Sequence, residues 1–162
     1  MGAAPLSKIL LAVDATEASL AAARYGIAVA GIYGAELHAV YVVNEKLLEE
    51  LLRAKVFVEA EEVDLEVDLE EDGNRYLSYV KKLARDKNVN VNTELLKGIV
   101  HREIVDKATQ IGATLIIIGE IEEPLSRKDA FYDEGEMILR RAGCPVLMVR
   151  GESLVDDIYD SL

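Results

Sequence analysis

A group of carboxylates follows a short apolar segment late in this sequence, and its residue types could do chemistry. Leu115–Gly119 is apolar, and residues 119–136 contain seven acids and two bases, a local formal charge of −5. Clustered oxygen ligands suit hard cations such as Ca²⁺ or Mg²⁺, so a metal-dependent enzyme is one alternative. The spacing of a known calcium loop is absent, and we predict a solvated loop. Its acids are Glu120, Glu122, Glu123, Asp129, Asp133, Glu134 and Glu136.

The histidines and the single cysteine offer little further chemistry. His101 begins a predicted helix after Gly98, without a serine or cysteine nucleophile that recognisably pairs with it, so we expect a local cap or a surface residue. Cys144 precedes an apolar segment and is expected to be a packed thiol. One cysteine excludes an intrachain disulfide. Gly-x-Gly-x-x-Gly, P-loop and His-x-Gly-His motifs are absent, and we therefore predict no catalytic residue and no enzyme.

Five short apolar segments predict the strands that position these residues. They alternate with helical patterns, which is typical of a parallel α/β sheet. The segment 63–70 alternates as a strand would, but a longer count over 61–87 favours a helix despite Gly73. We predict a single doubly wound α/β domain with a five-stranded parallel sheet. Its strands are expected at 8–14, 37–43, 89–96, 115–119 and 146–149, and its other helices at 16–30, 101–111 and 133–142.

The net charge and the hydropathy of the chain limit the classes of molecule that it could bind. The 162-residue chain has a formal net charge of −12, which disfavours nucleic acid and anionic membranes because both require cations on the protein. The sequence contains no apolar run of about 20 residues that would cross a bilayer, and its start lacks the apolar core of a signal peptide. We expect one cytoplasmic domain over 1–150, followed by an acidic tail over 151–162.

Several segments together resemble the universal stress protein family over residues 8–149. The first strand with Asp14 and Ser19, the segment 38–43, the segment 113–119 and the segment 144–149 follow the family pattern in order. This resemblance implies an adenine nucleotide alpha hydrolase-like fold. It also implies a homodimer formed through the last strand, at Val146, Leu147, Met148 and Val149.

The resemblance also allows a test of ATP binding. Family members that bind ATP carry Gly-x2-Gly-x9-Gly-Ser/Thr after the fourth strand, where glycines let backbone amides approach phosphates. Counted from Gly119, the other three positions hold Glu122, Tyr132 and Asp133. One of four positions fits, and the surrounding charge is negative. We therefore predict no tight ATP binding and no cofactor.

Two functions remain open at this point. The first is a homodimeric, non-enzymatic stress-response or interaction module, in which the tail residues Leu154, Val155, Ile158 and Tyr159 cover the dimer seam or bind another, unidentified protein. The alternative is an adenine-nucleotide sensor for AMP, ATP or adenosine. By the family resemblance, its pocket would be lined by Val13, Asp14, Val40, Ile118 and Gly119. Asp14 also has a purely structural interpretation, as a hydrogen-bond partner of the first helix.

Overall fold

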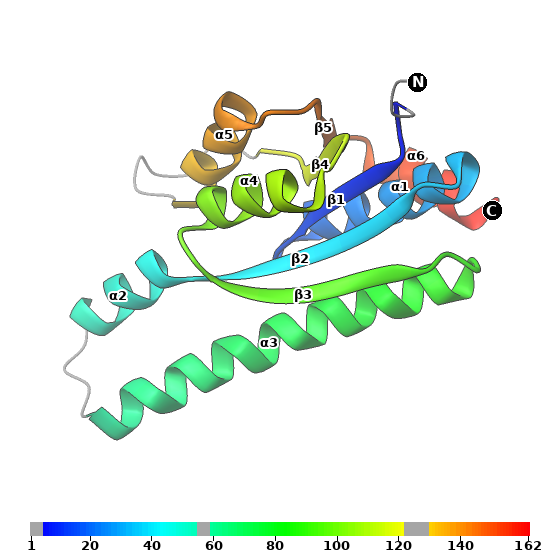
Figure 1. Ribbon diagram of the computed structural model, residues 1–162. Helices are drawn as coiled ribbons and strands as arrows, with labels where there is room; N and C mark the ends of the chain where they lie inside the picture. The colour runs from blue at the N-terminus through cyan, green and yellow to red at the C-terminus, as the bar shows by residue number, and fades with distance from the viewer. Residues whose placement is uncertain (1–4, 55–58, 122–129) are drawn as a thin grey trace.

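The protein is an α/β domain built on a five-stranded parallel sheet (Figure 1). The computed structural model describes residues 5–54, 59–121 and 130–162, with side chains described for all of these except 59–63 and 130–133. The strand order is β3-β2-β1-β4-β5, which confirms the predicted fold class. The strands are β1 (Lys8–Val13), β2 (Glu36–Asn44), β3 (Val91–Gly98), β4 (Leu115–Gly119) and β5 (Val146–Val149).

Two helical layers cover the sheet. One core cluster joins the sheet to α1 (Glu17–Tyr33), α3 (Glu59–Asp86) and α6 (Glu152–Asp160), and the other joins it to α4 (Val100–Ile111) and α5 (Ala130–Arg141). α2 (Glu45–Ala54) follows β2 directly. Strands covered on both faces are apolar along their whole length, as in β4, where Leu115–Ile118 are all buried. In the part of the chain that the structure describes, no helix is long and apolar enough to cross a membrane.

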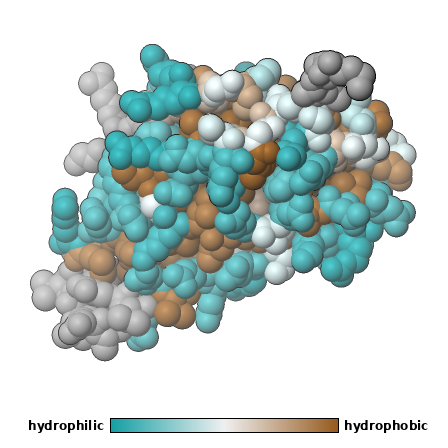
Figure 2. All heavy atoms as spheres, in the orientation of Figure 1, coloured by the Kyte–Doolittle hydropathy of each residue, from teal (hydrophilic) through white to brown (hydrophobic). Residues whose placement is uncertain are grey.

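Helix α3 is a single 28-residue helix, as the longer count over 61–87 predicted. It lies along β2 and β3, and its first turns project with α2 beyond the carboxyl ends of the strands (Figure 1). Hydrophilic and hydrophobic side chains are interleaved on the lower side of the molecule, where α3 runs (Figure 2). Gly73 allows a close approach to the sheet, because a Cβ there would lie 2.6 Å from Leu95 Cδ1 and 2.7 Å from Tyr41 Cδ1.

The C-terminal residues form helix α6, which packs on α1. Val155 and Tyr159 are buried, and the Tyr159 hydroxyl donates a 2.7 Å hydrogen bond to the Leu83 carbonyl of α3. These two side chains therefore stabilise the domain itself and are not available for the tail contact that we expected of them. Leu154, by contrast, is 65% exposed.

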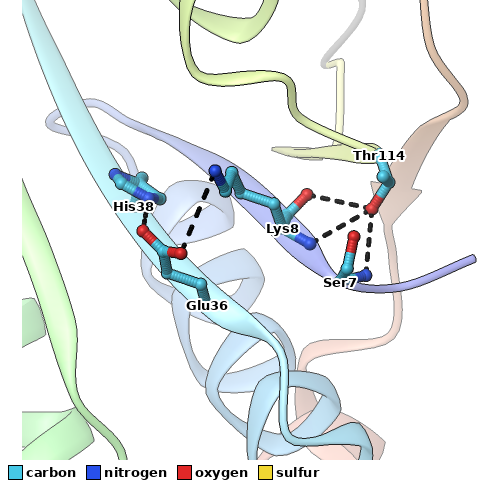
Figure 3. A network of polar contacts seen from close by, with 5 residues as sticks. All are labelled: Ser7, Lys8, Glu36, His38 and Thr114. Carbon is cyan, nitrogen blue, oxygen red and sulfur yellow. Dashed lines mark hydrogen bonds and ion pairs between the residues drawn. The ribbon is translucent and has the colours of Figure 1, made fainter. Parts of the chain in front are cut away.

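A polar network ties the two central strands together at their amino ends (Figure 3). The Thr114 hydroxyl accepts hydrogen bonds from the backbone amides of Ser7 and Lys8 and donates one to the Lys8 carbonyl, at 3.1–3.2 Å. On the neighbouring strand, Glu36 lies 2.6 Å from His38 Nε2 and 4.0 Å from Lys8 Nζ. Thr114, the residue immediately before β4, thus joins that strand to the start of β1.

Candidate functional site

A cavity of about 200 Å³ lies at the carboxyl ends of β1, β2 and β4. The chain leaves β1 for β2 on one side and reaches β4 on the other, so this is the switch point where doubly wound sheets bind ligands. Helices α2, α3, α4 and α5 each contribute to its walls. The lining residues are Ala12, Val13, Asp14, Thr16, Tyr41, Val42, Val43, Asn44, Leu47, Leu69, Val100, Ile104, Ile118, Gly119, Glu120, Ile121, Glu134, Gly135 and Ile138.

The structure brings four of the five predicted site residues together at this cavity. Val13, Asp14, Ile118 and Gly119 line it. Val40 does not, because its side chain is 1% exposed and packs in the core on the α4 side of the sheet. Val40 lies four residues before the end of β2, and the lining residues of that strand come from its last positions.

Asp14 is held by the start of the first helix. Its Oδ1 accepts hydrogen bonds from the Thr16 amide at 2.8 Å and from the Thr16 hydroxyl at 2.5 Å. Thr16 in turn caps α1 by accepting from the Ser19 amide, and Ser19 Oγ accepts from the Asp14 amide. The structural interpretation of Asp14 is therefore confirmed, and the carboxylate is fixed in place at the wall of the cavity.

Gly119 is required by packing at the end of β4. A Cβ on this residue would lie 2.7 Å from the Ala18 carbonyl group and 2.8 Å from the Ser19 nitrogen, all backbone atoms of α1. Backbone atoms cannot move aside as a side-chain end can. Packing against α1 therefore explains the glycine at position 119 without a bound nucleotide phosphate.

A buried carboxylate occupies the amino end of α4. Glu134 is 9% exposed, and its Oε2 accepts a 2.6 Å hydrogen bond from the His101 amide and lies 2.7 Å from His101 Nδ1. The cap residue Ile99 has no side-chain oxygen, and the first amides of a helix need an acceptor. Glu134 supplies that acceptor from α5, and its charge also suits the positive end of the helix.

This contact corrects two expectations. Glu134 is not a solvated loop acid, and His101 is neither a self-contained cap nor a surface residue, since its side chain is 12% exposed against an equally buried Glu134. The two residues are 33 positions apart and belong to no shared periodic pattern. The lack of a capping side chain at Ile99 was the available signal that a partner must come from elsewhere.

The charged side chains among the described lining residues of the cavity are all acidic. Asp14, Glu120 and Glu134 line it, and Glu120 is paired with Arg150 at 2.9 Å. Burial raises the pKa of the Tyr41 hydroxyl, and the Asp14 charge raises it further. The motif position Glu122 lies outside the described residues, as do the side chains of Tyr132 and Asp133.

Sequence reasoning missed the α2 side of the cavity and the residues beyond β4. Asn44 is buried, and its Oδ1 accepts from the Leu47 amide, so it begins α2 at the cavity wall. An asparagine directly after an apolar strand was a readable helix-start signal. Ile121 and Gly135 face each other, with a Cβ on Gly135 only 2.9 Å from Ile121 Cγ1. Among side chains that the structure describes, no cluster of three or more metal-ligating residues occurs.

The fold and the position of the cavity define a class of protein, the adenine nucleotide alpha hydrolase-like α/β proteins. Comparison with known proteins then gives the family. The model of the universal stress protein family matches residues 5–150, and the chain belongs to this family. This confirms the resemblance drawn from the sequence.

Individual relatives agree with that assignment. The universal stress protein MJ0531 of Methanocaldococcus jannaschii is 32% identical over 143 residues, which cover 88% of this chain and 81% of the relative. The universal stress protein YxiE of Bacillus subtilis is 25% identical over 146 residues, covering 89% and 99%. The solved structure of the protein MJ0577 superposes with a TM-score of 0.76 at 25% identity, covering 93% of this chain and 100% of that one.

Proposed function

We propose that this universal stress protein is a homodimeric, non-enzymatic stress-response or interaction module that does not bind ATP tightly. The observation that carries the proposal is the Glu134 carboxylate, which accepts a hydrogen bond from the α4 amide of His101 at the wall of the cavity. Helix amino ends are favourable sites for anions, and an internal carboxylate already takes this one. A phosphate placed there would meet a second negative charge at short range.

The size of the cavity supports the same proposal. Pockets for drug-sized ligands usually enclose about 300–1,000 Å³, and the described residues enclose about 200 Å³. The phosphate-loop pattern is also met at only one of its four positions, Gly119. Chemistry and volume thus both disfavour a triphosphate, and no residue is assigned a catalytic role.

Calorimetric titration with ATP and Mg²⁺ tests this proposal. We expect no micromolar binding by the wild type. Glu134→Gln removes the competing charge and should strengthen binding of ATP, while the matched change Glu136→Gln, in the same helix and outside the cavity lining, should not. Micromolar binding by the wild type would contradict the proposal, and identical titrations of all three proteins would contradict the role of Glu134.

The proposed dimer forms through β5. This strand is at the edge of the sheet, and Val146, Leu147 and Met148 are only half-buried. Apolar edge strands need a cover, and pairing with the same strand of a second copy would supply it. Light scattering at micromolar concentration should give twice the chain mass, whereas a monomer would contradict this part of the proposal.

The partners that we propose beyond the dimer are proteins. The net charge of −12 disfavours nucleic acid and anionic membranes. We also propose a cytoplasmic location as part of this function. A pull-down with nucleic acid or anionic vesicles at physiological salt should recover none of the protein.

The second candidate function is an adenine-nucleotide sensor. It is favoured by the position of the cavity beside Asp14 and Gly119 and by solved family structures that hold cAMP and, in the Archaeoglobus fulgidus protein, dAMP, at 15% and 17% identity to this chain. A thermal-shift panel of adenosine, AMP, ADP and ATP separates the candidates. A ligand at about 100 times its Kd adds roughly 2.7 kcal/mol of stability, so a shift with AMP or adenosine alone would favour the sensor.

A further inference from the structure

Helix α3 carries an uneven distribution of charge along its length. Its first half, residues 59–72, contains nine acids and no base, whereas residues 73–86 contain four bases and one acid. At 1.5 Å per residue the helix is about 42 Å long. The charges have the signs that favour each end of the helix dipole, so the helix is strongly polarised from one end to the other.

Charges of both signs are present on the face that points away from the sheet. Leu77, Val80 and Leu83 are buried against the core, and at 100° per residue the opposite side presents a run of exposed positions. This outer face of α3 consists of Asp64, Val67, Asp68 and Glu71 in the acidic half and Arg75, Tyr79, Lys82 and Arg85 in the basic half. Val67 and Tyr79 are apolar or aromatic and remain 44% and 39% exposed.

This face is complementary to itself when two copies run in opposite directions. In an antiparallel pair centred near residue 73, Asp64 of one copy stands at the level of Lys82 of the other, and Glu71 at the level of Arg75. Val67 and Tyr79 then also come to the same level, at the two edges of the contact, and neither meets a like charge there. A parallel pair would instead set acid against acid and base against base.

We propose that the outer face of α3 is a second self-association surface, which binds the same face of another copy in an antiparallel arrangement. A twofold axis makes each contact occur twice, and the opposed helix dipoles add to the attraction. α3 covers β2 and β3, at the other end of the sheet from β5. The two surfaces can therefore be used at the same time, and the α3 contact does not depend on the β5 dimer.

Net charge opposes any association of two copies, and this sets the conditions of the test. Two molecules of charge −12 repel over tens of ångströms, whereas the facing pairs on α3 act over a few. At about 0.1 M salt the Debye length is about 10 Å, which screens the long-range repulsion and leaves the short-range pairs active. At about 1 M the length is about 3 Å, and the pairs are weakened too.

Sedimentation equilibrium at these two salt concentrations tests the surface in the wild-type protein. We expect the weight-average mass to rise toward twofold at the lower salt as protein concentration increases. If the β5 dimer does not form, the mass should rise from that of a monomer to that of a dimer. If the β5 dimer does form, the mass should rise from that of a dimer to that of a tetramer or a longer assembly. The starting mass therefore reports on the β5 contact, and the rise reports on the α3 contact. A mass that does not change with salt at any concentration would overturn the proposal.

Charge reversal then identifies the surface. Asp64→Lys, Asp68→Lys and Glu71→Lys together make the face basic, and Arg75→Glu, Lys82→Glu and Arg85→Glu together make it acidic. Each triple variant alone should lose the salt-sensitive species, and an equal mixture of the two should regain it. The six changes combined in one chain should regain it as well.

A matched control separates the face from overall charge. Glu50→Lys, Glu152→Lys and Asp160→Lys change the net charge as the first triple does but at exposed positions outside α3. This control should keep the salt-sensitive species, and its loss there would overturn the assignment. Circular dichroism of each variant checks folding, and the wild-type salt series stands even if one triple variant unfolds.

Discussion

At the scale of single residues, a glycine that fits a ligand motif is explained by packing. Gly119 occupies the first position of the phosphate-loop pattern, yet its missing side chain is what lets β4 end against the backbone of α1. A residue that fits one position of a binding motif is therefore weak evidence for binding. The other positions of the motif and the charge around them decide the matter.

Replacing Gly119 by alanine should destabilise the protein whether or not a nucleotide binds. The new Cβ would meet rigid backbone atoms at 2.7 Å, and overpacking of this kind costs about 1–3 kcal/mol. Urea unfolding measures the loss. Gly143→Ala is the control, because a Cβ there meets nothing within 4 Å, and equal stability of both variants would contradict the packing explanation.

At the scale of elements, the long helix α3 contains a glycine that helix propensity alone disfavours. Gly73→Ala should gain about 1 kcal/mol of propensity but must displace Leu95 and Tyr41, with a typical overpacking cost of about 1–3 kcal/mol. We expect a net loss of up to about 2 kcal/mol in chemical denaturation. Asn74→Ala, one residue away and exposed, should instead be neutral or stabilising.

Helix α6 is fixed to the domain by Tyr159, and this contact should respond to pH. Tyr159→Phe removes the hydrogen bond to the Leu83 carbonyl and should cost about 0.5–1.5 kcal/mol at neutral pH. Burial, and then the Asp86 charge, raise the pKa of the Tyr159 hydroxyl. The hydroxyl of Tyr159 therefore holds its proton more tightly in the folded protein than in the unfolded chain. The free energy that this hydroxyl contributes to folding is fully present below about pH 10 and is lost as the pH rises through the folded-state pKa.

Urea unfolding between neutral pH and pH 11 measures that dependence. The stability difference between the wild type and Tyr159→Phe should shrink above about pH 10, because the variant has no proton to lose at this position. A difference that stays constant over the whole range would show that the hydroxyl does not couple to folding.

At the scale of the whole molecule, the sheet and its switch point were predictable from sequence, but the contacts across the cavity were not. A continuous apolar run such as that of β4 indicates a strand that is buried on both faces. This signal can be read from residues that are adjacent in the sequence. The pairing of Glu134 with His101 depends on where two helices end in space. Val40 is not among the residues that line the cavity for a similar reason, because the family pattern gives the strand but not which of its positions reach the cavity.

Thr114 connects distant parts of the chain, and its loss should weaken the whole fold. Thr114→Val removes the acceptor of the Ser7 and Lys8 amides, of which the first is exposed and the second part-buried, so the change should cost about 0.5–1.5 kcal/mol. Thermal or urea unfolding measures the change. Thr109→Val is the control, because the exposed Thr109 hydroxyl bonds only within its own helix, and it should change stability little.

The pairing of β1 with β4 also constrains how the chain folds. Ile9 pairs with Leu115 and Leu11 with Ile117, so the two central strands of the sheet are separated by most of the polypeptide. Closing so long a loop is entropically costly and makes folding slow relative to helical bundles. Residues 1–100 contain β1, β2 and β3 but lack the strand that covers the other edge of β1. During synthesis the backbone groups on that edge of β1 therefore stay unpaired until β4 leaves the ribosome, and an unpaired edge can join the wrong strand.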